Sequence, residues 1–118
     1  MVNSSDCVFC KMSKREIVTE FVSETRHFFA IRDIKPKTKG HTLIISKEHY
    51  SSLLELPSKL GRELVELAET IGSGLIKEGY GTGFNLVTNV GKSAGQVVPH
   101  VHFHIIPRKE GDGLHMIA

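Results

Sequence analysis

A long amphipathic pattern in the middle of the chain predicts one main helix. Between Leu60 and Leu75, apolar side chains recur every three or four positions, and charged side chains occupy many of the positions between them. This period gathers the apolar residues on one face of a helix. Pro57 suits the first turn of a helix, and Gly79 ends the pattern. We therefore predict a helix over about residues 57–79, with an apolar face that packs against other structure.

Short runs of β-branched and aromatic residues on both sides of that helix predict strands. The first two runs are separated by three polar residues, which is typical of a hairpin. A short turn or helix is expected around residues 7–14. Strands, one main helix and more strands indicate an α+β fold, with the helix on one face of a largely antiparallel sheet. The predicted strands cover residues 17–23, 27–32, 41–46, 84–87 and 98–107.

Length and composition fit a single domain over residues 1–118, which we expect in the cytoplasm. The chain has 118 residues and is 40% hydrophobic, enough for a core. Its 15 Lys and Arg residues are scattered and nearly balanced by 13 Asp and Glu residues, so nucleic acid is not an expected partner. No apolar run approaches the roughly 20 residues that span a bilayer, and residues 1–11 lack the apolar stretch of a signal peptide. A membrane is therefore not expected as a partner either.

Three of the seven histidines fall within five consecutive positions of the last predicted strand. Because side chains alternate between the two faces of a strand, every second residue shares a face. The imidazoles would lie roughly 6.5–7 Å apart and repel one another when protonated. Such a cluster is typical of a metal site or of acid–base and nucleophilic catalysis. The histidine face would carry His100, His102 and His104, and the core face Val101, Phe103 and Ile105.

Two chemistries fit this histidine face. In the first, all three imidazoles bind a catalytic metal that keeps an open position for water. In the second, one histidine is a nucleophile that its neighbours assist. The loop over residues 89–96 favours the second, because Gly91, Gly95 and small residues allow backbone N–H groups to turn toward an anion. A phosphate held by this loop would meet the histidine strand that follows it.

The chain resembles the histidine-triad (HIT) family over most of its length. That family's signature alternates three histidines with apolar residues, and it is complete here as His100-Val-His102-Phe-His104-Ile-Ile106. The resemblance implies a HIT-like fold, with a largely antiparallel five-stranded sheet, the main helix and a short N-terminal helix. The branch that it is most similar to is the Hint-like nucleoside phosphoramidases. Other matching segments are residues 6–11, 28–36 and 41–49, Asn89-x-Gly91 and Ala94-Gly-Gln96.

The resemblance implies an enzyme that acts at the α-phosphate of a nucleotide without a catalytic metal. His102 would attack phosphorus and form a nucleotidyl-histidine, which water or another acceptor then releases. His104 would hydrogen-bond the phosphate and assist the leaving group, and His41 would support the triad, of which His100 is the first member. Asp33 would accept hydrogen bonds from the ribose, or else it forms a turn. The phosphate would be bound by Asn89, Gly95, Gln96 and Val97, and the base by Phe9, Ile31 and Ile34.

Cys7 and Cys10 form a C-x-x-C pair, which in a reducing compartment indicates half of a metal site or a redox pair. Some proteins that the chain resembles hold a structural zinc with two cysteines and two histidines. The matching positions here are Cys7, Cys10, His49 and His100. Such a ligand set suits a closed tetrahedral Zn²⁺ site. The alternative is a pair of ordinary buried thiols.

The resemblance also implies a substrate class and an assembly. The substrate would be an AMP conjugate such as an adenosine phosphoramidate, with a purine nucleotide as the bound ligand. A homodimer would form through the main helix and an edge strand. Val97 stands where the Hint branch has a serine, so a hydroxyl near the leaving group is missing. Three other functions stay open: a dinucleoside polyphosphate hydrolase, a metalloenzyme with histidine ligands, and a nucleotide-binding module without activity.

Overall fold

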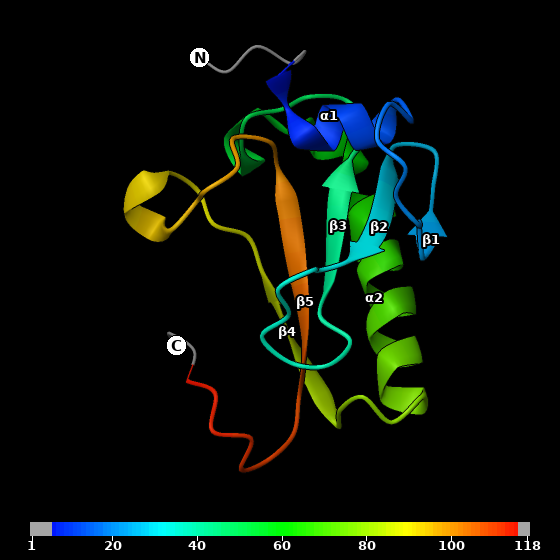
Figure 1. The fold of residues 1–118 in the computed structure, drawn as a ribbon, viewed down its shortest axis with the longest axis vertical. Helices are drawn as coiled ribbons and strands as arrows, with labels where there is room; N and C mark the ends of the chain where they lie inside the picture. The colour runs from blue at the N-terminus through cyan, green and yellow to red at the C-terminus, as the bar shows by residue number, and fades with distance from the viewer. Residues whose placement is uncertain (1–5, 116–118) are drawn as a thin grey trace.

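One antiparallel sheet organises the chain (Figure 1). The strands are β1 (Ser23–Glu24), β2 (Phe28–Arg32), β3 (Thr42–Ser46), β4 (Gly83–Val87) and β5 (His102–Arg108), and the α-helices are α1 (Val8–Ser13) and α2 (Gly61–Lys77). The structure is a computed structural model and describes residues 6–115. Its strands lie in the order β1-β2-β3-β5-β4, and every neighbouring pair is antiparallel. The predicted α+β class, five-stranded sheet, main helix and short N-terminal helix are confirmed.

The helix α2 packs on one face of the sheet, as its apolar period predicts. A 3-10 turn over Ser58–Leu60 follows Pro57 and leads into the helix. Gly79, just after the helix, has a φ of +88°, a conformation that favours glycine. Gly72 permits close packing, since a Cβ there would lie 2.3 Å from Cε2 of Phe84 in β4. The buried cluster of this face comprises Phe28, Ala30, Ile44, Leu60, Leu67, Ala68, Leu75, Val101, Phe103 and Ile105.

The opposite face of the sheet carries α1 at one end. Phe9 of α1 is buried there against residues of β2 and β3. In the register of β3 and β5, His102 pairs with Ile45 and His104 with Leu43, so both histidines share this face. The buried cluster of this face comprises Cys7, Phe9, Cys10, Phe29, Ile31, Leu43 and Ile45. Beyond α1, the face is left open around the two histidines.

The first predicted strand is largely wrong. Of residues 17–23, only Ser23 belongs to β1, which pairs with β2 through two residues. The chain before it is a connection from α1: the backbone N–H of Ile17 donates to the carbonyl of Lys11, and Val18 is fully exposed. The β-branched composition predicted a strand wrongly, because strand propensity does not reveal whether a partner strand is available for pairing. The predicted hairpin exists, but it is shorter.

The last predicted strand starts later than expected. β5 begins at His102 rather than at residue 98. Pro99 has no N–H to donate, and the N–H groups of the next two residues bond to carbonyls outside the β5 ladder. The chain bends there. His100 therefore lies outside the strand, although its ring packs against Phe9 on the same side of the sheet as the ring of His102.

The remaining predicted strand limits equal the observed ones or differ from them by a single residue. Within residues 6–115, no helix has both the length and the apolarity needed to cross a bilayer. The predicted domain limits, residues 1 and 118, lie outside the described residues, as do the first five residues of the polar N-terminal segment.

Candidate active site

A cavity of about 560 Å³ opens beside His102 and His104. The centroids of the two rings are 5.1 Å apart. Residues of α1, of the loop after β2 and of the loop between β4 and β5 form the walls, and the volume is in the range of small-molecule sites. The cavity is lined by Val8, Phe9, Met12, Ile31, Arg32, Asp33, Ile34, Lys35, Lys37, Leu43, Asn89, Gly95, Val97, Val98, His102 and His104.

The hydrogen bond of His102 determines which ring nitrogen is free. Nδ1 lies 2.7 Å from the backbone carbonyl oxygen of His100. A carbonyl oxygen can only accept, so Nδ1 carries the hydrogen and donates it. In the neutral ring, Nε2 is then unprotonated and holds a lone pair. The arrangement leaves one nucleophilic nitrogen on a ring that lines the cavity.

A chain of hydrogen bonds determines the tautomer of His104 in the same way. The backbone N–H of Lys37 donates to Nδ1 of His41 at 3.1 Å, so the hydrogen of neutral His41 is on Nε2. That N–H donates to Nδ1 of His104 at 2.9 Å. The hydrogen of neutral His104 is therefore on Nε2, which becomes a donor. His41 itself is buried behind His104 and is not among the residues that line the cavity.

Burial keeps the rings of His41 and His104 neutral. It lowers the pKa of His104 from 6.5 to about 4, and the neighbouring His102 and His41 lower it further. Burial also lowers the pKa of His41, although the Asp33 carboxylate, 3.6 Å from Nε2 of His41, opposes this effect. At neutral pH, His104 is thus a neutral hydrogen-bond donor beside the lone pair of His102.

The loop between β4 and β5 brings backbone and small side chains to the cavity. Gly91 and Gly95 have φ values of +88° and +89°, a region that favours glycine. Asn89, Gly95 and Val97 line the cavity, and Val97 is 89% exposed. Gln96 does not line it: Oε1 accepts the N–H of Gly91 at 2.9 Å, and Nε2 donates to two backbone carbonyls. The side chain of Gln96 therefore braces the loop.

The residues predicted to bind the nucleoside also line the cavity. Phe9 comes from α1, and Ile31, Asp33 and Ile34 come from β2 and the loop after it. Ile34 is 92% exposed, so its side chain is free to pack against a ligand. Oδ1 of Asp33 accepts the N–H of Lys35 at 2.9 Å, which is the turn that the alternative interpretation of Asp33 predicts. Because a carboxylate has further lone pairs, forming this turn leaves Asp33 able to contact a ligand.

A cluster of cysteines and histidines lies where α1 meets the bend before β5. Sγ of Cys7 lies 3.2 Å from Nδ1 of His100. Sγ of Cys10 lies 3.2 Å from Nδ1 of His49 and 3.5 Å from Nδ1 of His100. All four atoms lie within 4.8 Å of one another. The structure thus brings together the four residues that the sequence resemblance implies for a metal.

This donor set fits Zn²⁺. Tetrahedral zinc with Zn–S of about 2.3 Å and Zn–N of about 2.0 Å separates its ligand atoms by roughly 3.3–3.8 Å. The observed contacts of 3.2 to 3.5 Å are close to that range. Nε2 of His100 donates to the carbonyl of Ser46 at 2.8 Å, so Nδ1 keeps a lone pair for a metal. Burial lowers the pKa of His100 to about 4, which also keeps this ring neutral.

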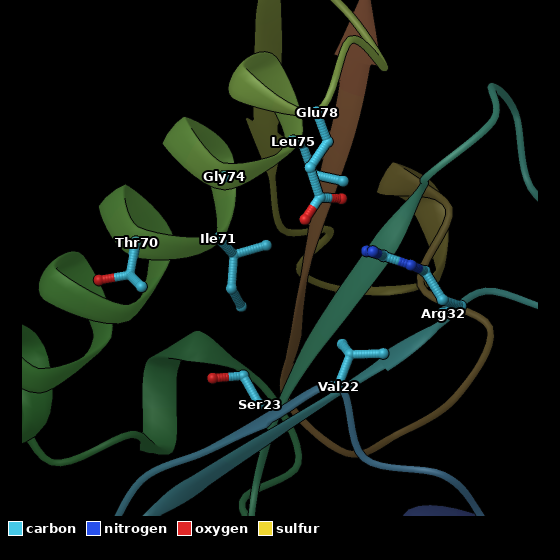
Figure 2. A pocket seen from close by; sticks show the side chains of 8 residues that line it. All are labelled: Val22, Ser23, Arg32, Thr70, Ile71, Gly74, Leu75 and Glu78. Atoms are coloured by element: carbon cyan, nitrogen blue, oxygen red, sulfur yellow. The ribbon is translucent and has the colours of Figure 1, made fainter.

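A smaller hollow lies between α2 and the edge formed by β1 and β2 (Figure 2). Its volume is about 170 Å³. Figure 2 shows the side chains of Arg32 and Glu78 extending into it from β2 and from the end of α2. The Arg32 guanidinium donates to the carbonyl of Gly40 and to Oγ1 of Thr42. Among the described residues, no histidine or cysteine lines this hollow, so it lacks the side chains predicted for catalysis or metal binding.

Sequence reasoning did not single out Lys35, Lys37 and Ser46. The two lysines line the cavity from the loop after Asp33. Their position close to a predicted ligand residue was the only signal in the sequence, because loop conformation decides where such side chains lie. Ser46, whose carbonyl accepts from His100, becomes visible only once the bend before β5 is known.

Comparison with known proteins identifies relatives that cover most of the chain. The family model described as HIT domain matches residues 14–111. A HIT-like protein of Methanocaldococcus jannaschii is 45% identical over 107 residues, which cover 91% of this chain and 82% of that protein. The adenylylsulfatase HINT3 of Arabidopsis thaliana is 40% identical over 110 residues, 93% of this chain and 56% of that protein. The adenosine 5'-monophosphoramidase hnt1 of Schizosaccharomyces pombe is 38% identical over 102 residues, 86% of this chain and 74% of that protein.

Solved structures of HIT-family proteins also align with most of this chain. The crystal structure of a HIT family protein from Bacillus anthracis aligns with a TM-score of 0.89 at 36% identity, covering 98% of this chain and 83% of that one. A zinc-bound histidine triad family protein from Mycobacterium smegmatis aligns with a TM-score of 0.88 at 34% identity, covering 96% of this chain and 82% of that one. Because the family match and these alignments agree over most of its length, the chain belongs to the HIT domain family.

Proposed function

We propose that this HIT-family hydrolase, acting as a single domain, cleaves AMP conjugates at the α-phosphate through a covalent nucleotidyl intermediate on His102. The observation that carries the proposal is the hydrogen bond between Nδ1 of His102 and the carbonyl oxygen of His100. The Nδ1–H of His102 is donated to this backbone carbonyl, which leaves the Nε2 lone pair on the ring that lines the cavity. A neutral imidazole of this kind is a suitable nucleophile, and it splits one difficult displacement into two easier ones.

The reaction proceeds in two displacements. Nε2 of His102 forms a bond to phosphorus while the bond from phosphorus to the leaving group breaks, and the leaving group takes the bonding electron pair. Nε2–H of His104 donates to a phosphate oxygen, as do backbone N–H groups near Gly95. Water then forms a bond to phosphorus, the electron pair of the P–N bond returns to Nε2, and the water protons pass to solvent or to the leaving group. His41 acts through His104, whose tautomer it fixes.

The remaining cavity residues bind the nucleotide. Phe9, Ile31 and Ile34 form an apolar wall for a purine base. Asp33 accepts hydrogen bonds from the ribose hydroxyls with the lone pairs that its turn leaves free. Asn89 and the loop backbone up to Val97 hold the phosphate. Two relatives support AMP as the nucleotide and differ in what is joined to it, since one is named an adenylylsulfatase and the other an adenosine 5'-monophosphoramidase.

We also propose that Cys7, Cys10, His49 and His100 hold a structural zinc. Their contacts suit a tetrahedral ion, and a zinc-bound relative has the same fold. The ion would tie α1 to the chain just before β5 and so hold one wall of the cavity. The two cysteines are free thiols, as a metal site in a reducing compartment such as the cytoplasm requires.

A homodimer is the proposed assembly. Val65 and Ile76 of α2 lie on one helix face and are 53% and 39% exposed, and Leu86 of the edge strand β4 is 49% exposed. Gly72, on the same helix face, packs against Phe84 of β4, so this apolar surface continues from α2 to the edge strand. A second copy covering it would bury all three side chains.

The test is a His102→Ala variant assayed with adenosine 5'-phosphoramidate and adenylyl sulfate, with His115→Ala as the matched control. His115 is exposed and is not among the cavity residues. We expect the His102 variant to lose about a thousandfold or more of kcat while AMP affinity persists. Brief incubation of the wild type with substrate, followed by mass spectrometry, should show AMP attached to His102. Wild-type turnover in the His102 variant would refute the mechanism, and AMP binding without turnover by the wild type would indicate a binding module.

A further inference from the structure

We propose that the cavity selects AMP conjugates whose leaving group is an oxyanion of the sulfate or phosphate class, in preference to an amine. The inference rests on the proposed attack by His102 and concerns the group that departs. Lys35 and Lys37 carry it: both line the cavity from the loop that follows β2.

The cavity has an excess of cationic side chains available to a ligand. Its lining contains one carboxylate, Asp33, which already accepts a backbone N–H and lies 3.6 Å from Nε2 of His41. The guanidinium of Arg32 is turned toward α2 instead, where Figure 2 shows it. Within residues 6–115, neither Lys35 nor Lys37 forms an ion pair with a carboxylate. Two ammonium groups therefore remain for an anionic ligand.

Lys37 lies close to the reacting pair. Its backbone N–H bonds to His41, which bonds to His104, and the ring of His104 is 5.1 Å from that of His102. Burial and the neighbouring histidines lower the pKa of His104 most; the Asp33 carboxylate raises it and the Lys37 charge lowers it, so both of these charges act at the site of reaction. Attack from His102 expels the leaving group on the opposite side of phosphorus. Because Lys37 lines the same cavity, its ammonium group can attract negative charge on that group.

The proton donors around the cavity suit an oxyanion better than an amine. An amine must gain a proton as its bond to phosphorus breaks, whereas sulfate leaves with the P–O electron pair as a stable dianion. The loop between β4 and β5 lines the cavity with Asn89, Gly95, Val97 and Val98, none of which is an acid, and a lysine ammonium is a weak acid that stabilises an anion more readily than it gives up a proton. His104 is a neutral donor that would have to give up its proton without charge assistance. Water then releases AMP from His102, and both water protons pass to solvent.

The experiment compares kcat/KM for three substrates: adenylyl sulfate, diadenosine triphosphate and adenosine 5'-phosphoramidate. The proteins are the wild type, the double variant Lys35→Gln/Lys37→Gln, and Lys39→Gln, a control in the same loop that does not line this cavity. We expect the wild type to prefer an oxyanion substrate over the phosphoramidate. In the double variant, the preference should fall about five- to tenfold, as two partly exposed ion pairs allow. Lys39→Gln should keep it, and salt should weaken it in the wild type.

Every outcome of this comparison supports or overturns the proposed preference for an oxyanion leaving group. A higher rate with the sulfate identifies sulfate as the favoured oxyanion, and a higher rate with the triphosphate identifies phosphate; both support the proposal. A wild-type preference for the phosphoramidate overturns it. An equal loss on all substrates in the double variant also overturns it, because the lysines would then serve AMP rather than the leaving group. Absence of any turnover or His102 adduct would instead refute the proposed function itself.

Discussion

Acidification should destabilise the protein through His104, and the size of the effect follows from its burial. Burial lowers the pKa of His104 from 6.5 to about 4 in the folded protein. The unfolded chain therefore binds a proton more tightly than the folded one in this interval. The sign is that of a buried neutral group: its contribution is complete above pH 6.5 and is lost as the pH falls toward 4. The loss of stability therefore falls between about pH 6.5 and pH 4.

The magnitude comes from the slope of 1.36 kcal/mol for each unit of pKa difference. Going from pH 7 to pH 5 crosses about 1.5 units of this window, which corresponds to about 2 kcal/mol. Because His104 faces an open cavity, solvent reduces this to about 1–2 kcal/mol. The variant His104→Gln keeps a polar side chain that can accept from Nε2 of His41, but it cannot titrate. Its stability should therefore fall less over the same interval.

Urea unfolding at pH 7 and pH 5 measures the difference. The wild type should lose about 1–2 kcal/mol more than His104→Gln between the two pH values, and titrating groups that do not contact His104 cancel in the comparison. His115→Gln, which alters an exposed histidine, serves as the control and should follow the wild type. Parallel behaviour of the wild type and His104→Gln would show that the ring is not held neutral by burial.

Two further predictions concern packing and the metal. Gly72→Ala should lower the free energy of unfolding by about 1–3 kcal/mol, because its Cβ would lie 2.3 Å from the Phe84 ring; Gly74→Ala, in open space on the same helix, is the control in a urea titration. An unchanged midpoint for Gly72→Ala would contradict the packing described. Cys10→Ser should reduce bound zinc from about one ion per chain to a small fraction and lower the Tm, measured by elemental analysis and calorimetry. Equal zinc content in variant and wild type would rule out the proposed ligand set.

The fold was predictable where a pattern depends on one element alone. The period of 3.6 residues in α2 places Leu67, Ala68 and Leu75 on the buried face, and the observed helix lies within the predicted range. Pairing of strands depends on distant residues, so Val18 was assigned to a strand although it has no partner there. The absence of a partner strand decided that outcome, and local propensity does not encode which strands pair.

The sequence also predicted part of the candidate site. Alternation along β5 correctly placed His102 and His104 on one face of the sheet. His100 precedes β5 because Pro99 cannot join the ladder, yet its ring lies against Phe9 as that of His102 does. Loop geometry was the other limit. The bracing role of Gln96 and the place of Lys37 in the cavity wall depend on backbone angles that no spacing rule supplies. The roles of all these residues stay predictions until the experiments above are done.

His100 contributes its side chain to one site and its backbone carbonyl to the neighbouring site. The ring belongs to the cysteine cluster, whereas the carbonyl oxygen accepts the hydrogen of the His102 ring. Exchange of a side chain does not remove a main-chain oxygen. A descendant of this protein that lost both thiols and the imidazole at position 100 would still be able to orient His102, provided that the turn made by Pro99 persisted. Metal ligation and ring orientation are therefore free to evolve separately in this chain.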